Sequence, residues 1–191
     1  MLLTSTFLPL IIYAGDTRTI SRGSGFGTYY YDVDQVHACG TAFEFQNSGP
    51  VGCGVENYIS LNQIDSNYLV AMNNTQLVGN WNTYCGKRVI VSVNGQSSSL
   101  PLFIGDGCTR CSNGPESTNV WNPAGAPGLD FSYSVLNELS ANACADGHIS
   151  ITWEIIDEMI YPFDHTSSYI SRIPTPTCNQ VSYTAMQITL R

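Results

Sequence analysis

Gly27-Thr28-Tyr29-Tyr30 begins an ordered series of short motifs that runs through most of this chain. No motif of this length identifies a fold by itself, but the motifs become specific when their order is considered together. The later members are Ala38-Cys39-Gly40, Val70-Ala71-Met72-Asn73, Cys85-Gly86-Lys87, Gly105-Asp106-Gly107-Cys108-Thr109-Arg110-Cys111, Leu129-Asp130-Phe131-Ser132 and Gly147-His148-Ile149-Ser150-Ile151-Thr152-Trp153.

Strand patterns dominate the region that carries these motifs. Runs of β-branched and aromatic residues, bounded by Gly, Asn and Ser, predict strands. They cover residues 28–31, 68–72, 88–93, 100–104 and 148–156. Asn94-Gly95 lies between apolar runs and predicts a tight β-hairpin.

A single helix is predicted from Ser132 to about Ala143, where apolar residues recur at helical spacing. Asp130 or Ser132 can cap its first turn. The segments 46–67 and 111–128 are predicted to be irregular. Many short strands with one helix are typical of a small all-β barrel.

Composition limits the classes of function. The chain has 191 residues, enough for one sizeable core. Its net charge is −8, and its seven Lys and Arg residues are scattered along the sequence. Binding to nucleic acid or to an anionic membrane is therefore not expected. Tyrosine faces and amide side chains suit a neutral glycan better.

The N-terminus predicts export. Residues 7–13 are apolar but too few to cross a bilayer, and the small residues Ala14 and Gly15 follow. We expect residues 1–14 to be a secretory signal peptide and the mature protein to be extracellular. The alternative is an N-terminal strand packed on the core. No other segment is apolar enough for a membrane helix.

Seven cysteines agree with an oxidising compartment, and an odd number leaves at least one free or paired between chains. A CxxC without a second pair or suitably spaced histidines favours a structural disulfide, so no metal is expected. Asn73-Asn74-Thr75 is the one glycosylation sequon, with Asn73 as the acceptor. The disulfide candidates are Cys39, Cys53, Cys85, Cys108, Cys111 and Cys144, and Cys178 is the seventh cysteine.

The ordered motif set resembles the six-stranded double-psi β-barrel of expansins, barwin-like proteins and the rare-lipoprotein-A-like domain, and most of all the small fungal loosenins. The resemblance covers residues 23–156 and implies an all-β domain with one short helix. Residues 157–191 are too few for the second, sugar-binding domain of expansins and are expected to wrap the barrel. The implied function is to bind and loosen cell-wall polysaccharide of cellulose or chitin type without ordinary hydrolysis or a cofactor.

The resemblance also implies a site. It assigns Thr28, Asp106 and Asp130 to one end of an open groove. From the residues themselves, Tyr29 and Tyr30 are expected to stack on sugar rings, whereas Trp153, on an alternating strand, is more typical of the core. A carboxyl group in a groove that partly excludes water has a raised pKa, so it can donate to a glycosidic oxygen or accept from sugar hydroxyls. The structural alternatives are a helix cap at Asp130, a turn residue at Asp106 and a routine strand residue at Thr28.

Other functions remain open on the same barrel. Thr28 to Asp32 resembles a motif of fungal endoglucanases, which would make Asp32 the base and Asp130 the acid of an inverting pair. A solvated acidic loop from Asp32 to Asp34 is favoured over that role. Further alternatives are a lytic transglycosylase, a protein-binding inhibitor or effector, and a small-molecule tailoring enzyme, because a fold does not determine function.

Overall fold

Seven strands form where the sequence has short β-branched and aromatic runs, in a computed structural model that describes residues 17–112 and 120–163. The strands are β1 (Thr19–Tyr31), β2 (Leu69–Asn73), β3 (Lys87–Val93), β4 (Gln96–Ser97), β5 (Leu102–Cys108), β6 (Gly128–Ser132) and β7 (His148–Met159). The strand predictions between residues 28 and 156 fall on these elements, with ends that differ by a few residues or, in β1, by more, while the strand-like segment 181–190 lies outside the described residues.

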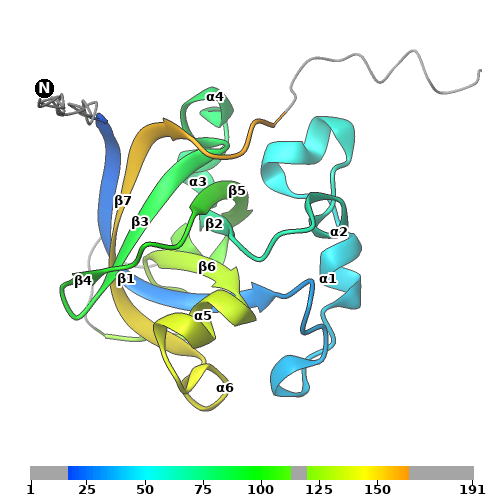
Figure 1. Cartoon of the computed structure of the whole chain (residues 1–191), viewed down its shortest axis with the longest axis vertical. Coiled ribbons are helices and arrows are strands. Elements are labelled where there is room, and N and C mark those ends of the chain that lie inside the picture. The colour runs from blue at the N-terminus through cyan, green and yellow to red at the C-terminus, as the bar shows by residue number, and fades with distance from the viewer. Residues whose placement is uncertain (1–16, 113–119, 164–191) are drawn as a thin grey trace, which may run out of the picture.

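Six of the strands close into a ring. The order is β4-β3-β5-β2-β6-β1-β7. Because β3 also pairs with β7, the strands from β3 to β7 in this order form a closed ring, and β4 is the described strand outside it. The β1–β6 and β2–β5 pairs are parallel, whereas β1–β7, β2–β6, β3–β5 and β3–β7 are antiparallel. Figure 1 shows β1, β3 and β7 as long neighbouring strands, with α1 and α2 on the opposite side of the ring. The expectation of a mostly-β fold built on a six-stranded ring is confirmed.

The expectation of one short helix is wrong. The described residues contain α1 (Glu44–Ser48), α2 (Leu61–Ile64), α3 (Asn74–Leu77), α4 (Trp81–Tyr84), α5 (Tyr133–Leu139) and α6 (Ala143–Asp146), with 3₁₀ turns η1 (Ala38–Gly40), η2 (Gly52–Asn57) and η3 (Arg110–Ser112). Most are single turns, too short to produce an apolar period in sequence. The segment 46–67, predicted to be irregular, is built largely from such turns.

The predicted helix begins where expected but ends early. The hydroxyl of Ser132 accepts from the backbone N–H of Val135, so Ser132 is the N-cap and Asp130 is not. The first helix stops at Leu139, and α6 follows as a separate turn. Asp130 is therefore free of the capping role that sequence reasoning allowed it.

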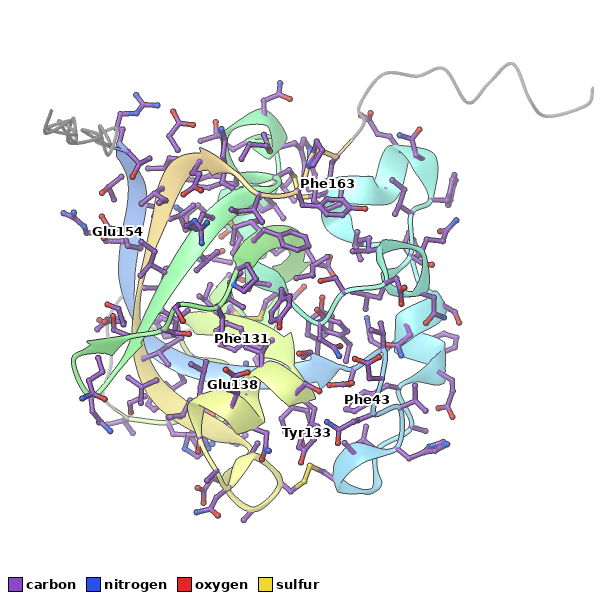
Figure 2. The ribbon with its side chains drawn as sticks, viewed as in Figure 1. Phe43, Phe131, Tyr133, Glu138, Glu154 and Phe163 are labelled. Carbon is purple, nitrogen blue, oxygen red and sulfur yellow. A yellow bond between two sulfur atoms is a disulfide. The ribbon has the colours of Figure 1, made fainter. Side chains whose placement is uncertain are left out.

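The core fills the inside of the ring. Phe131 from β6 and Tyr31 from β1 are fully buried and pack with Leu69, Ile104 and Ile155 from three other strands. Figure 2 labels Phe131 within the ring, while Glu154 lies on its outer side. The phenol of Tyr31 donates to the carbonyls of Ser66 and Leu69, which satisfies its one polar atom.

The hairpin prediction at Asn94-Gly95 is confirmed. Both residues have positive φ, 51° and 79°, as the turn type with the best match to strand twist requires. They connect β3 to β4, which pairs with it through Val93 and Gln96.

The barrel extends past the expected boundaries of 23 and 156. Strand β1 begins at Thr19, and β7 continues to Met159. Beyond it, Tyr161 stacks on Phe103 at 4.9 Å, and Phe163 is buried. The start of the C-terminal extension thus packs on the barrel. The predicted signal peptide, Cys178 and residues 164–191 lie outside the described residues. No helix in the described part is long and apolar enough to cross a membrane.

All six predicted disulfide candidates are paired. Cys39 bonds Cys144, Cys53 bonds Cys85, and Cys108 bonds Cys111. The structural disulfide expected for the CxxC motif is present, and of the two pairings left open, local or with another cysteine, it is the local one. Three disulfides in a chain of this size are typical of proteins that fold in an oxidising compartment.

Candidate functional site

Three residues singled out by sequence lie in one row across the barrel. Thr28 on β1 pairs with Asp130 on β6, and Ala71 on β2 pairs with both Asp130 and Asp106 on β5. On the other side, Thr28 pairs with His148 on β7. Directly opposed residues on neighbouring strands project from the same face of a sheet. The row therefore brings Thr28, Asp106 and Asp130 together, with the small Ala71 between the two carboxyl groups.

Arg110 joins two members of this row. Its Nη2 donates to the Asp130 carboxylate at 2.7 Å and also to the Thr28 hydroxyl. The ion pair is largely buried, since the side chains of Arg110 and Asp130 are 24% and 14% exposed. Such a charge-assisted bond is stronger than one between neutral groups. Oδ2 of Asp130 has no hydrogen-bond partner in the described part of the chain and can meet a ligand.

The pKa of Asp130 reflects opposing effects. Burial raises the pKa of this carboxyl above its ordinary value, and the nearby charge of Asp106 raises it further. The Arg110 guanidinium opposes both, but burial is the larger effect. Asp130 is therefore a carboxyl that can hold a proton at higher pH than an exposed aspartate.

Asp106 is held in place by three donors. Its Oδ1 accepts from the backbone N–H groups of Gly52 at 2.7 Å and Gly107 at 2.8 Å, and its Oδ2 accepts from the Tyr30 hydroxyl at 3.0 Å. Burial raises the pKa of Asp106, and these bonds act in the other direction. Burial and the Asp106 charge also keep the pKa of Tyr30 well above its usual value, so the phenol stays a donor.

A groove opens over this end of the row. Its volume is about 440 Å³, and it is lined by Thr28, Tyr29, Tyr30, Thr41, Phe43, Arg110, Trp121, Pro123, Asp130 and Gly147. The lining offers hydroxyl groups and aromatic rings, and Asp130 and Arg110, which neutralise one another, are its two charged members. A groove of this chemistry suits an uncharged ligand that is rich in hydroxyl groups.

The two predicted stacking tyrosines differ in their surroundings. Tyr29 makes edge contacts with Phe43 and Tyr133, at 6.1 and 5.8 Å between ring centroids. Figure 2 labels Phe43 and Tyr133 near one another below the ring. The Tyr30 ring packs against Tyr31 at 4.9 Å between centroids, and the Tyr30 hydroxyl donates to Asp106. Both rings line the groove, but Tyr30 also acts as the support of Asp106.

Asp32 is not part of the groove. Its side chain is fully buried, which corrects the expectation of a solvated acidic loop. Oδ1 accepts from the backbone N–H groups of Asp34 and Gln35, and Oδ2 accepts from that of Ser134 at 2.7 Å. The carboxylate therefore fixes the turn after β1 to the start of α5. The structure does not bring Asp32 beside Asp130 in the groove.

Changing Asp32 to asparagine should destabilise the fold without a direct effect on the groove. The new amide can still accept from Asp34 and Gln35, but its NH₂ would face the Ser134 N–H, and two donors cannot bond. The cost should be about 1–3 kcal/mol of unfolding free energy, the usual penalty for a buried polar group left unpaired. Urea unfolding measures it. Unchanged stability would contradict the structural role assigned to Asp32.

Sequence reasoning missed Arg110, Trp121 and His148. The Trp121 ring stacks on His148 at 4.1 Å with an interplanar angle of 6°, and the Arg110 guanidinium lies 5.2 Å from the same ring. Arg110 was within the quoted CxxC motif, which drew attention only to its cysteines. Trp121 was in a segment predicted to be irregular, and nothing in sequence links such a residue to β7.

One cluster has the composition of a metal site. Ligand atoms of Cys108, Cys111 and Asp130 lie within 4.8 Å of one another. The two sulfurs are joined in a disulfide, and Arg110 holds the carboxylate. A cysteine binds a metal as a thiolate, so the two disulfide-bonded cysteines cannot serve as ligands in the oxidised protein.

Comparisons with known proteins do not identify a family for this chain. No family model and no curated protein matches the chain. The Streptomyces papain inhibitor is 22% identical, with 74% of this chain and 99% of that chain covered and a TM-score of 0.42. An expansin from Clavibacter michiganensis is 16% identical, with 74% of this chain covered and a TM-score of 0.43. The match spans 54% of that expansin. At these TM-scores, the function of neither protein can be assigned to this chain.

Proposed function

We propose that this protein is extracellular and that its groove binds a neutral cell-wall polysaccharide, of cellulose or chitin type, and loosens it without ordinary hydrolysis. We further propose that the six-stranded ring is a double-psi barrel of the kind found in expansins and loosenins. The two parallel strand pairs and the order of the sequence motifs support that topology. Three disulfides support an extracellular location.

The observation that carries the proposal is the single carboxyl group of the groove. Asp130 is the one Asp or Glu among the described lining residues. Inverting hydrolysis needs a second carboxylate, about 6.5–9.5 Å from the first, to activate water. Asp106 has both oxygens occupied by Gly52, Gly107 and Tyr30, and Asp32 is buried elsewhere. Among the described residues, the groove thus offers one exchangeable carboxyl beside a hydroxyl and a guanidinium.

This arrangement suits hydrogen-bond exchange with a glycan. Oδ2 of Asp130 can accept from a sugar hydroxyl. The Thr28 hydroxyl, which accepts from Arg110, keeps its own proton to donate. A polymer chain that bonds to these groups gives up bonds to its neighbours in the solid, so the packing of adjacent chains loosens. No covalent bond forms or breaks.

A joint assay of binding, loosening and cleavage tests the proposal. The oxidised protein is incubated with insoluble cellulose and chitin. Depletion from solution, the extension of a loaded polymer strip and release of soluble sugar are then measured. Binding and extension without soluble products are expected. Soluble products with new reducing ends would contradict the proposal and show that the protein is a hydrolase. Products lighter by one water than hydrolysis products would show instead that the protein is a lytic transglycosylase, a reaction for which one carboxyl group is enough. Absence of binding would leave a protein or small-molecule target.

A further inference from the structure

A second cavity lies away from the groove, along the earlier half of β1. Its volume is about 500 Å³, within the range of ligand sites. The groove is lined by β1 at Thr28 to Tyr30, whereas this cavity is lined by Ser21 and Gly23 of the same strand. The turn η3 separates the two, because Arg110 lines the groove and Cys111 lines the cavity.

An indole ring forms one wall of this cavity. The ring of Trp153 lies directly against Gly23, where a Cβ atom would come within 2.2 Å of a ring carbon. Only glycine permits this contact, so the position of the ring depends on the absence of a side chain at residue 23. Trp153 remains partly exposed and lines the cavity, with the buried Leu129 also in the wall. A fixed aromatic face of this kind suits the apolar face of a sugar ring.

Two side-chain amides supply complementary polar atoms. Gln76 donates from Nε2 to Ser21 at 3.1 Å and to Tyr84 at 2.8 Å, which fixes its orientation and leaves Oε1 as an acceptor. Asn73 accepts through Oδ1 from the start of α3, which leaves Nδ2 as a donor. Neither Oε1 nor Nδ2 has a partner among the described residues.

The cavity is close to electrically neutral. Its described lining contains no Asp, Glu or Lys, and Arg22 is its one charged side chain. The Arg22 guanidinium is bonded to Glu154 at 2.7 Å, on the outer side of the barrel. An acceptor, a donor and an aromatic face, without free charge, form a binding set for a neutral hydroxyl-rich ring rather than for an ion.

We propose that this cavity binds one neutral sugar residue, which stacks on Trp153 and bonds to Gln76 Oε1 and Asn73 Nδ2. The sugar has two possible sources. It is either part of a free polysaccharide or the first residue of a glycan on Asn73. Asn73 lies in the sequon and lines the cavity, and Nδ2 is the atom to which an N-linked sugar attaches. Attachment there leaves Oδ1 free to continue capping α3. The proposal does not depend on the groove.

The test observes the indole N–H of Trp153 directly by heteronuclear NMR. The chain has three tryptophans, and Trp153→Phe identifies the signal. In one arm, the oxidised protein from a host without N-glycosylation is titrated with cellohexaose and chitohexaose. In the other, protein carrying one residual sugar on Asn73 is compared with unglycosylated protein. A saturable shift in the first arm assigns the free polymer, and a difference in the second assigns the attached glycan. No change of the Trp153 signal in either arm overturns the proposal.

Two variants separate the cavity from the groove and from the proposed function. Asp130→Asn should leave the Trp153 response unchanged. If instead it abolishes the response, the cavity is not an independent site. Gln76→Ala should weaken the binding roughly three- to tenfold, as expected for one hydrogen bond. Gln46→Ala is the matched control, because it removes an exposed side-chain amide in α1 that does not line the cavity. This variant should bind as wild type does. Equal affinities of the Gln76 and Gln46 variants would overturn the assigned contacts.

Discussion

Replacing Asp130 with asparagine should strongly reduce polymer loosening. It should also lower the melting temperature, because Arg110 loses the charged partner of a largely buried ion pair. Asparagine fits the strand position, and Ser132 rather than Asp130 caps the following helix, so no cap is lost. The variant loses the charged acceptor that would meet the sugar. Such a bond is worth about 1.5–3 kcal/mol, which corresponds to roughly 10- to 150-fold in affinity or rate.

The loosening activity should also depend on pH in a defined direction. Burial raises the pKa of Asp130, so its ionised form appears only at higher pH than for an exposed aspartate. Loosening that needs the ionised acceptor should rise with pH through that raised pKa, and this rise should vanish in the asparagine variant. Asp65→Asn is the matched control, since it removes an exposed carboxylate away from the groove. If Asp130→Asn retains full activity on every polymer that wild type acts on, the groove assignment is wrong.

Removing the Cys39–Cys144 disulfide should cause the largest loss of stability from any single crosslink. The bond closes a loop with a sequence separation of 105 and joins η1 to α6. In the chain-entropy model, a crosslink over a loop of that order contributes about 4.7 kcal/mol, close to the whole stability of many domains. The double variant Cys39→Ser, Cys144→Ser should therefore unfold at much lower urea concentration. Its m-value should be larger, because the unfolded chain exposes more surface.

The Cys108–Cys111 bond is the matched control. Its sequence separation is 3, for which the same model gives roughly 2 kcal/mol. Cys108→Ser, Cys111→Ser should thus cost less stability. It should reduce loosening more, because Arg110 lies between these cysteines and holds Asp130 and Thr28. Equal losses of stability in the two double variants would show that loop length does not determine the contribution of these disulfides.

The strands and the hairpin were predictable because their signals are local. A run of β-branched residues or an Asn-Gly pair acts through its own backbone, wherever the rest of the chain lies. The row of Thr28, Asp106 and Asp130 was reached differently. No local rule places residues so distant in sequence side by side, and only the resemblance of the ordered motifs suggested a common groove.

The remaining features depend on contacts that sequence does not encode locally. Asp32 looks like a solvated loop residue, yet three backbone N–H groups surround it, one of them from Ser134, far along the chain. Arg110 reaches Asp130 because η3 follows β5, and β5 lies two strands away from β6 in the ring. The single-turn helices satisfy local hydrogen bonds without an apolar period. Their existence follows from packing on the ring.

Closure of the ring through β3 and β7 also affects how the protein behaves at high concentration. An open sheet has two exposed edges whose unpaired backbone groups can recruit strands from other molecules. Here, six strands are paired on both sides, and the strand left at an edge within the described residues is β4, which has only two residues. Within the part of the chain that the structure describes, edge-to-edge aggregation therefore has little backbone to start from. A protein that accumulates at the surface of an insoluble polymer can become crowded there without forming fibres.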